Sequence, residues 1–172
     1  MDISIVGKNS IKLKGKQATF VVDPSKEMPK TSADGIVLLN GTTGIDTARI
    51  TESRIIINGP GGYEVAGAKV VGTTTPKGTL YKFTIDDVVI ILGRSSETKA
   101  EGFNACQAAV INTDLDFNES FVTSLEPKIT VLYGDKKIES AKTLGAESVT
   151  SVPKITITKD KLPEKMEVVV LG

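Results

Sequence analysis

The chain has 172 residues, which suits one conventional domain with a buried core. Lys plus Arg and Asp plus Glu both number 21, so the formal net charge is zero and no overall field favours nucleic acid or an anionic membrane. The chain has no His and a single Cys, Cys106, which excludes a Cys/His zinc site and catalysis by a Ser-His-Asp or Cys-His arrangement.

Short runs of β-branched residues, separated by turn residues, dominate the first third of the chain. They predict strands over residues 2–6, 11–14, 19–22, 35–39 and 54–57. The glycine-rich segment at residues 58–62 follows, and it predicts a tight turn that redirects the chain between strands. A loop that presents its backbone to a ligand is the alternative interpretation of this segment.

The remainder of the chain continues with strands and adds helices. The predicted strands form hairpins over 63–71 and 79–92, buried strands at 108–111 and 129–133, and closing strands at 148–150, 154–158 and 167–171. Asp114 or Asp116 is expected to cap a helix that ends near Leu125, and a second helix over 136–144 is expected to end at Gly145. Weaker helical signals cover 43–51 and 96–102.

This order of elements favours an α+β sandwich over a regularly alternating doubly wound sheet. We expect a single domain over residues 1–172, with two pseudo-symmetric halves at roughly 1–75 and 76–172. No apolar run is long enough to span a membrane, and no secretion signal precedes the first strand, so a cytoplasmic location without membrane spans is expected.

Several segments together resemble the metallo-β-lactamase fold, and within it the predicted metal-dependent hydrolases related to ascorbate-6-phosphate lactonase. Residues 3–10 are similar to the opening strand and Leu-Gly-His-Ser turn of this branch, and residues 20–24 to its strand ending in Asp-Pro. The most specific match is residues 58–65, Asn-Gly-Pro-Gly-Gly-Tyr-Glu-Val, which resembles Gly-Pro-Gly-Glu-Tyr-Glu-Val. The resemblance implies a minimal αββα sandwich of two mixed β-sheets with flanking helices.

The metal ligands of the family are not retained. Its His-x-His-x-Asp-His motif falls on Gly41, Thr43, Ile45 and Asp46, its next histidine near Lys77, its bridging aspartate on Arg94, and its last histidine near Gly134. Only Asp46 keeps any ligand character, and Arg94 replaces a bridging anion with a permanent cation. The resemblance therefore implies a vestigial metal site, with no metal, no cofactor and no catalytic residue.

We interpret the chain as a catalytically inactive protein, a pseudoenzyme, with a binding or assembly role. One alternative is a binder of a small anion, a phosphate or carboxylate metabolite, held by Gly41, Thr42, Thr43, Lys77 and Arg94. The other is a residual hydrolase in which carboxylates converge with Asp46 around Mg²⁺ or Mn²⁺. The expected partner is a protein or a small anion rather than nucleic acid or a membrane.

Simpler structural roles exist for the same residues. Arg94 could form an internal ion pair with Asp46 or Glu97, and the loop at 41–44 could have relaxed after the loss of its ligands. Cys106 lies beside an apolar run, which predicts a buried, unreactive thiol. An exposed edge strand, such as residues 2–6, would invite self-association into a homo-oligomer.

Overall fold

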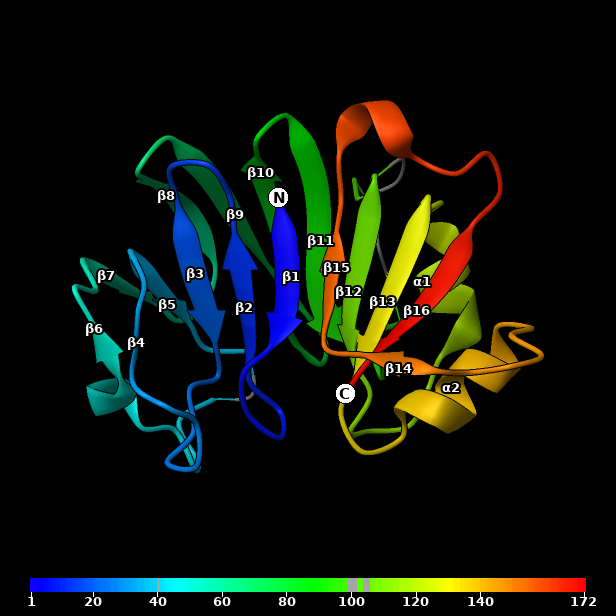
Figure 1. Ribbon diagram of the computed structural model, residues 1–172, viewed down its shortest axis with the longest axis horizontal. Helices are drawn as coiled ribbons and strands as arrows, with labels where there is room; N and C mark the ends of the chain where they lie inside the picture. The colour runs from blue at the N-terminus through cyan, green and yellow to red at the C-terminus, as the bar shows by residue number, and fades with distance from the viewer. Residues whose placement is uncertain (40, 99–101, 104–105) are drawn as a thin grey trace.

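The computed structural model describes residues 1–39, 41–98, 102–103 and 106–172, and it shows two β-sheets packed face to face (Figure 1). The first sheet has the strand order β15 (Lys154–Thr156), β1 (Asp2–Ile5), β2 (Ile11–Lys14), β3 (Thr19–Val22), β5 (Gly35–Val37), β7 (Ile55–Ile57). The second has the order β14 (Ser151–Val152), β16 (Glu167–Leu171), β13 (Ile129–Tyr133), β12 (Ala108–Asn112), β11 (Val88–Arg94), β10 (Gly78–Ile85), β9 (Ala68–Thr75), β8 (Gly61–Val65). Two short strands, β4 (Thr31–Ser32) and β6 (Ile50–Thr51), pair beside the first sheet.

Both sheets contain parallel and antiparallel pairs. In the first, β15, β1, β2 and β3 are antiparallel, whereas β3, β5 and β7 are parallel. In the second, β8 to β11 are antiparallel, and β11, β12, β13, β16 and β14 are parallel. Helices α1 (Glu119–Ser124) and α2 (Lys137–Thr143) lie outside the second sheet (Figure 1). The predicted α+β sandwich of two mixed sheets is confirmed.

The main core lies between the two sheets, because side chains on alternate strand positions point inward. In β2, Ile11 and Leu13 are buried while the lysines between and after them face outward. Phe20 of the first sheet meets Phe83 of the second edge-to-face, with ring centroids 5.4 Å apart. A second cluster packs Phe121 and other helical residues against the outer face of the second sheet.

The glycine-rich segment carries the chain from one sheet to the other, in agreement with the predicted turn. It connects β7 of the first sheet to β8 of the second. A Cβ atom on Gly72 would lie only 2.6 Å from the Gly59 carbonyl oxygen, so the crossing lies directly against β9. The Tyr81 hydroxyl accepts a hydrogen bond from the Gly59 backbone N–H at 2.8 Å and donates to the Leu38 carbonyl at 3.2 Å. Tyr81 thus joins the second sheet to the crossing and to the first sheet.

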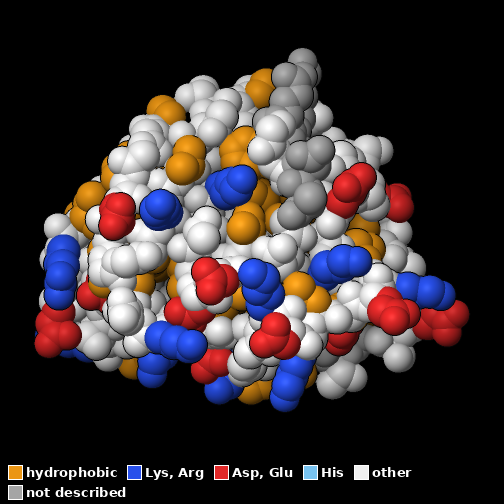
Figure 2. Space-filling view, turned by 90° about the horizontal axis from the view of Figure 1, so that it is seen from above, with side chains coloured by type: hydrophobic (Ala, Val, Ile, Leu, Met, Phe, Trp, Pro, Cys, Tyr) orange, Lys and Arg blue, Asp and Glu red, His pale blue; other side chains and the backbone are white. Residues whose placement is uncertain are grey.

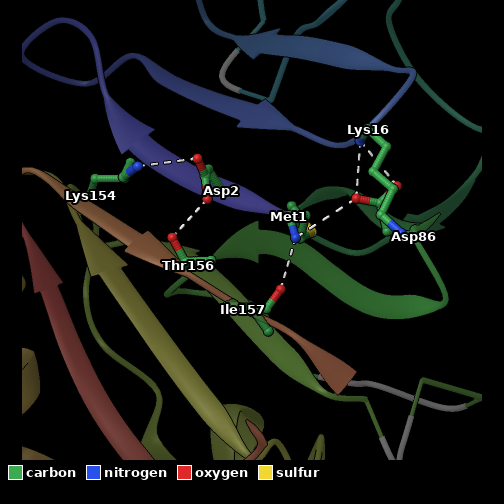
Figure 3. Close-up of polar contacts among 7 residues, drawn as sticks. All are labelled: Met1, Asp2, Lys16, Asp86, Lys154, Thr156 and Ile157. Carbon is green, nitrogen blue, oxygen red and sulfur yellow. Dashed lines mark hydrogen bonds and ion pairs between the residues drawn. The ribbon is translucent and has the colours of Figure 1, made fainter. Parts of the chain in front are cut away.

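The first strand lies inside its sheet, which makes the expected edge at residues 2–6 wrong. The β1 strand pairs with β15 on one side and β2 on the other, so the sheet ends at β15 and β7 instead. The Met1 ammonium donates to the Ile157 carbonyl at 2.8 Å and lies 3.7 Å from the Asp86 carboxylate (Figure 3). Thr156 donates to Asp2 at 2.7 Å, and this hydrogen bond lowers the pKa of Asp2.

The helices differ in detail from their predictions. Asn118, not Asp114 or Asp116, caps α1, and its side chain accepts from the Phe121 N–H at 3.2 Å. The end of α2 at Gly145 is as predicted, with a left-handed φ of 85°. Within 43–51 there is only a short 3₁₀ helix, η1 (Thr47–Arg49), and a second, η2 (Lys159–Lys161), precedes β16. Part of the weak prediction at 96–102 lies outside the described residues.

Two further expectations concern the chain as a whole. The chain passes from the first sheet to the second between β7 and β8, and the division into pseudo-symmetric halves near residue 75 stays a prediction. Within the described part of the chain, no helix has the length and apolar character needed to cross a membrane.

Figure 2 shows basic and acidic side chains interspersed over the face in view, without a large patch of one sign.

Candidate functional site

A cleft of about 580 Å³ opens where several strand-connecting loops meet. Four loops, which follow β1, β3, β5 and β12, and the last residue of β11 form its walls, so five strands position the cleft. Its lining residues are Lys8, Asn9, Ser10, Asp23, Ser25, Lys26, Glu27, Thr43, Gly44, Ile45, Arg94, Asp114 and Leu115. Three are cationic and three acidic, and the cleft falls within the size range of sites for small molecules.

Arg94, at the end of β11, binds through its guanidinium to the segment that follows β5 of the first sheet. Its Nε and one terminal nitrogen, Nη2, donate to the Leu39 carbonyl at 3.1 and 2.6 Å. Gly78 lies against the same group, since a Cβ there would be 3.0 Å from Nη2. The part of the chain that the structure describes contains no carboxylate within ion-pair distance of this guanidinium.

The two carboxylates expected to pair with Arg94 are placed elsewhere. Asp46 accepts from the Ala48 N–H at 3.2 Å, which caps η1, and lies 3.5 Å from Arg49. Glu97 is fully buried, and among the described residues neither of its carboxylate oxygens has a hydrogen-bond partner. The predicted internal ion pair of Arg94 is therefore wrong.

Asp114 forms the opposite wall and is held by three N–H donors. The Asn9 and Asn112 side chains donate to Oδ2 at 2.7 and 3.1 Å, and the Asp135 backbone N–H donates to Oδ1 at 2.8 Å. Gly134 lies directly behind it, because a Cβ there would be 2.6 Å from Oδ1. These contacts explain why Asp114 does not cap a helix: its carboxylate already organises the cleft.

Tyr133 lies fully buried close to these charged groups. Burial raises the pKa of Tyr133 well above its usual value, and the nearby Asp23 and Asp114 carboxylates add to that rise in pKa while Arg94 opposes it. The Asn112 side chain is near enough to lower this pKa, yet the hydroxyl has no hydrogen bond of acceptable geometry among the described residues. An unpaired hydroxyl thus lies among the residues that form the cleft wall.

Known proteins with similar structures identify the architecture. A Thermotoga maritima protein, described as a candidate zinc-dependent hydrolase of the metallo-β-lactamase superfamily, matches 99% of this chain and 98% of its own with a TM-score of 0.74 and 18% identity. The chain has the metallo-β-lactamase fold. A diphosphatase of the PhnP family matches with a TM-score of 0.54, 11% identity and coverage of 96% and 82%. Zinc-bound PqqB from Methylobacterium extorquens matches with 0.55, 10% and 86% of each chain. No protein-family model and no curated protein matches the sequence.

Some of the residues that the sequence resemblance assigns to a vestigial metal site meet in the cleft and others do not. Thr43, Ile45 and Arg94 line it. Gly41 and Thr42 are exposed in the same loop without lining the cleft. The positions outside the lining are Asp46 on η1, Lys77 in the exposed β9–β10 turn beside Gly78, and Gly134 behind Asp114.

Sequence reasoning missed the residues contributed by the β1–β2 turn, the loop after β3 and the end of β12. These are Lys8, Asn9, Ser10, Asp23, Ser25, Lys26, Glu27, Asp114 and Leu115. A signal for four of them was present, because residues 3–10 and 20–24 carry the family resemblance and contain Lys8, Asn9, Ser10 and Asp23. The resemblance places these residues at a turn and at the end of a strand, and residue type alone does not indicate that both positions face one cleft.

The donors present do not fit the metal centre that this fold holds in zinc-dependent hydrolases. Among the described residues there is no group of three or more His, Cys, Asp or Glu that could hold a metal ion. Asp114 is already engaged by three N–H donors, and Asp46 does not line the cleft. Cys106 is buried against the helices, and burial raises its pKa to about 12. The carboxylate site for Mg²⁺ or Mn²⁺ around Asp46 is likewise not supported by these positions.

Proposed function

We propose that this chain is a catalytically inactive protein of the metallo-β-lactamase fold that acts by binding rather than by metal-dependent hydrolysis. The observation that carries the proposal is the guanidinium of Arg94 in the cleft, at a position to which the family resemblance of the sequence assigns a metal-bridging aspartate. Its two bonds to the Leu39 carbonyl hold this cation in place.

Electrostatics and ligand count both act against a hydrolytic metal at this position. A divalent ion about 4 Å from a guanidinium would be repelled by roughly 8 kcal/mol at an effective dielectric of about 20. A hydrolytic zinc also needs about three protein ligands to hold the ion and to lower the pKa of its bound water to about 7. The chain has no histidine to supply them, and among the described residues the carboxylates do not gather into such a group.

Metal content and hydrolysis together test the proposal. The protein is incubated with Zn²⁺, Mn²⁺ or Mg²⁺, dialysed, and analysed by plasma mass spectrometry. It is then assayed on lactone, phosphodiester and diphosphate substrates with and without chelator. We expect metal well below one ion per chain and no chelator-sensitive turnover.

A matched variant separates cleft binding from surface binding of metal. Asp114→Asn removes the charge of the cleft carboxylate, and Asp116→Asn removes a neighbouring carboxylate that is exposed and paired with Lys136. One retained ion per chain that Asp114→Asn abolishes and Asp116→Asn leaves in place would show the proposal to be wrong. Metal-dependent turnover with the same pattern would do so as well.

A further inference from the structure

The strongest unexplained feature of the cleft is a cation without a counter-ion. Arg94 is partly buried, and within the described residues it has no ion-pair partner. A backbone carbonyl neutralises only part of a guanidinium charge, and a partly buried cation gains most from an anion that approaches from the solvent side. The open side of Arg94 is the cleft itself.

The hydrogen bonds of Arg94 leave one edge of its guanidinium available. The edge formed by Nε and Nη2 is occupied by the Leu39 carbonyl. The end-on edge, formed by Nη1 and the second N–H of Nη2, keeps parallel donors of the kind that bind a carboxylate or phosphate in a bidentate manner. Because Leu39 and Gly78 restrict the group, little rotamer entropy remains to be lost when a ligand binds.

The formal charges that line the cleft balance, with three cations and three carboxylates, so anion binding depends on the local donors of Arg94 and not on the field of the whole cleft. Asp114 accepts from three N–H groups, and Asp23 accepts from the Leu39 N–H at 2.8 Å, so hydrogen bonds within the fold stabilise both carboxylates in their charged form. Lys26, on the same rim, has no ion-pair partner in the described part of the chain. Glu27 is exposed on the same rim and opposes anion binding from there.

We propose that the cleft binds a small metabolite through a carboxylate or phosphate group, which pairs end-on with Arg94 while Lys26 supports it from the rim. This inference rests on the proposed function, because an anion and a metal would compete for the same space. A cleft of about 580 Å³ accommodates more than a bare ion, so the ligand carries an uncharged body beside its anionic group. Thr43 and Ser25 supply hydroxyls, and Leu115 an apolar surface, for that body.

Titration followed by ¹H–¹⁵N NMR spectroscopy tests the inference on the intact chain. The probes are glycerol 3-phosphate for the phosphate arm, succinate for the carboxylate arm, and glycerol as the neutral control, all at constant ionic strength. We expect saturable shifts from one or both anions at roughly 10 mM or below, confined to residues 8–10, 25–27, 43–45 and 94, and none from glycerol.

Variants decide whether Arg94 is the recognition group. Arg94→Gln is expected to weaken binding roughly tenfold or more, and Arg94→Lys to weaken it less, because Lys keeps the charge and loses the bidentate edge. Arg54→Gln, which removes an exposed arginine beside Asp34 on the outer face of the first sheet, is expected to leave binding unchanged. If the Arg94→Gln variant loses the dispersion of its spectrum and is therefore unfolded, the wild type is compared with Arg94→Lys instead.

The outcomes separate the two proposals. Absence of saturable shifts from both anions, or equal binding by the wild type and the Arg94 variants, overturns the inference and leaves the proposed function standing. Equal weakening by Arg54→Gln also overturns it, because the effect would then reflect overall charge. Stoichiometric, cleft-dependent metal overturns the proposed function and is detected independently by mass spectrometry.

Discussion

The same substitution, Tyr to Phe, is expected to have different effects on the free energy of unfolding at two buried tyrosines. Tyr81 and Tyr133 are both fully buried in the second sheet, and replacement by Phe removes one oxygen atom from each. The Tyr81 hydroxyl bonds the Gly59 N–H and the Leu38 carbonyl, whereas the Tyr133 hydroxyl has no partner among the described residues. Comparing the two variants therefore tests whether the link between the sheets depends on the Tyr81 hydroxyl.

The expected magnitudes follow from the groups left behind. Tyr81→Phe leaves a largely buried carbonyl and a partly buried N–H unpaired, which costs about 1–3 kcal/mol of the free energy of unfolding. For a chain of this length that corresponds to a fall in Tm of about 2–4 °C per kcal/mol, or roughly 6 °C in the middle of the range. Tyr133→Phe removes an unsatisfied buried hydroxyl, so we expect a change between about zero and 1 kcal/mol of stabilisation.

Urea unfolding followed by far-ultraviolet circular dichroism measures both variants, with Tm from calorimetry as a second readout. Equal m-values would show that the denatured states are comparable. The reasoning is refuted if Tyr133→Phe destabilises the protein as much as Tyr81→Phe, because Tyr133 would then have a partner that its geometry does not indicate.

Three further predictions use other parts of the fold. Gly72→Ala is expected to cost about 1–3 kcal/mol because its Cβ would meet the Gly59 carbonyl, whereas Gly62→Ala, with no atom within 4 Å, is expected to cost much less; urea unfolding of both decides. Cys106, with a pKa raised to about 12 by burial, should stay unreactive toward a thiol-specific disulfide reagent at pH 8 until urea unfolds the protein, and rapid labelling of the native chain would contradict its burial. The lowered pKa of Asp2 stabilises the fold above the unfolded value near pH 4, and this contribution is lost as the pH falls through the folded pKa, so Asp2→Asn should flatten the stability curve below about pH 4; an unchanged acid limb would refute it.

The fold was predictable where local sequence and tertiary packing agree. Strand β2 alternates Ile11 and Leu13 with lysines, and a period of two suffices to predict a half-buried strand. The crossing at residues 58–62 was predictable from its glycines, since few other residues tolerate such a turn. Gly145 ended α2 as expected for a residue with left-handed backbone conformation.

The cleft was less predictable because its contacts join residues far apart in the chain. Asp114 is a residue type that often caps helices. Its carboxylate instead accepts a hydrogen bond from Asn9, 105 positions away, and Asn118 caps α1. The charge of Arg94 was evident from the sequence, but its acceptor is a backbone carbonyl 55 positions away. Because every residue has a backbone carbonyl, residue type cannot indicate which one accepts the bond. Patterns of residue type predict strands well, and they predict long-range polar partners poorly.

The position of Arg94 connects the two proposals physically. A cation that is fixed by a carbonyl raises the free energy of any metal ion beside it, and the same fixed charge lowers the free energy of an anion there. Under both proposals, the charge of Arg94 therefore disfavours a metal ion and favours an anion at this point of the cleft. Because the Leu39 carbonyl lies in the segment that follows β5 of the first sheet and Arg94 ends β11 of the second, that preference depends on the packing of the two sheets. Loosening their contact, as Tyr81→Phe is expected to do, should then weaken anion binding as well as stability, while Tyr133→Phe should not reduce stability.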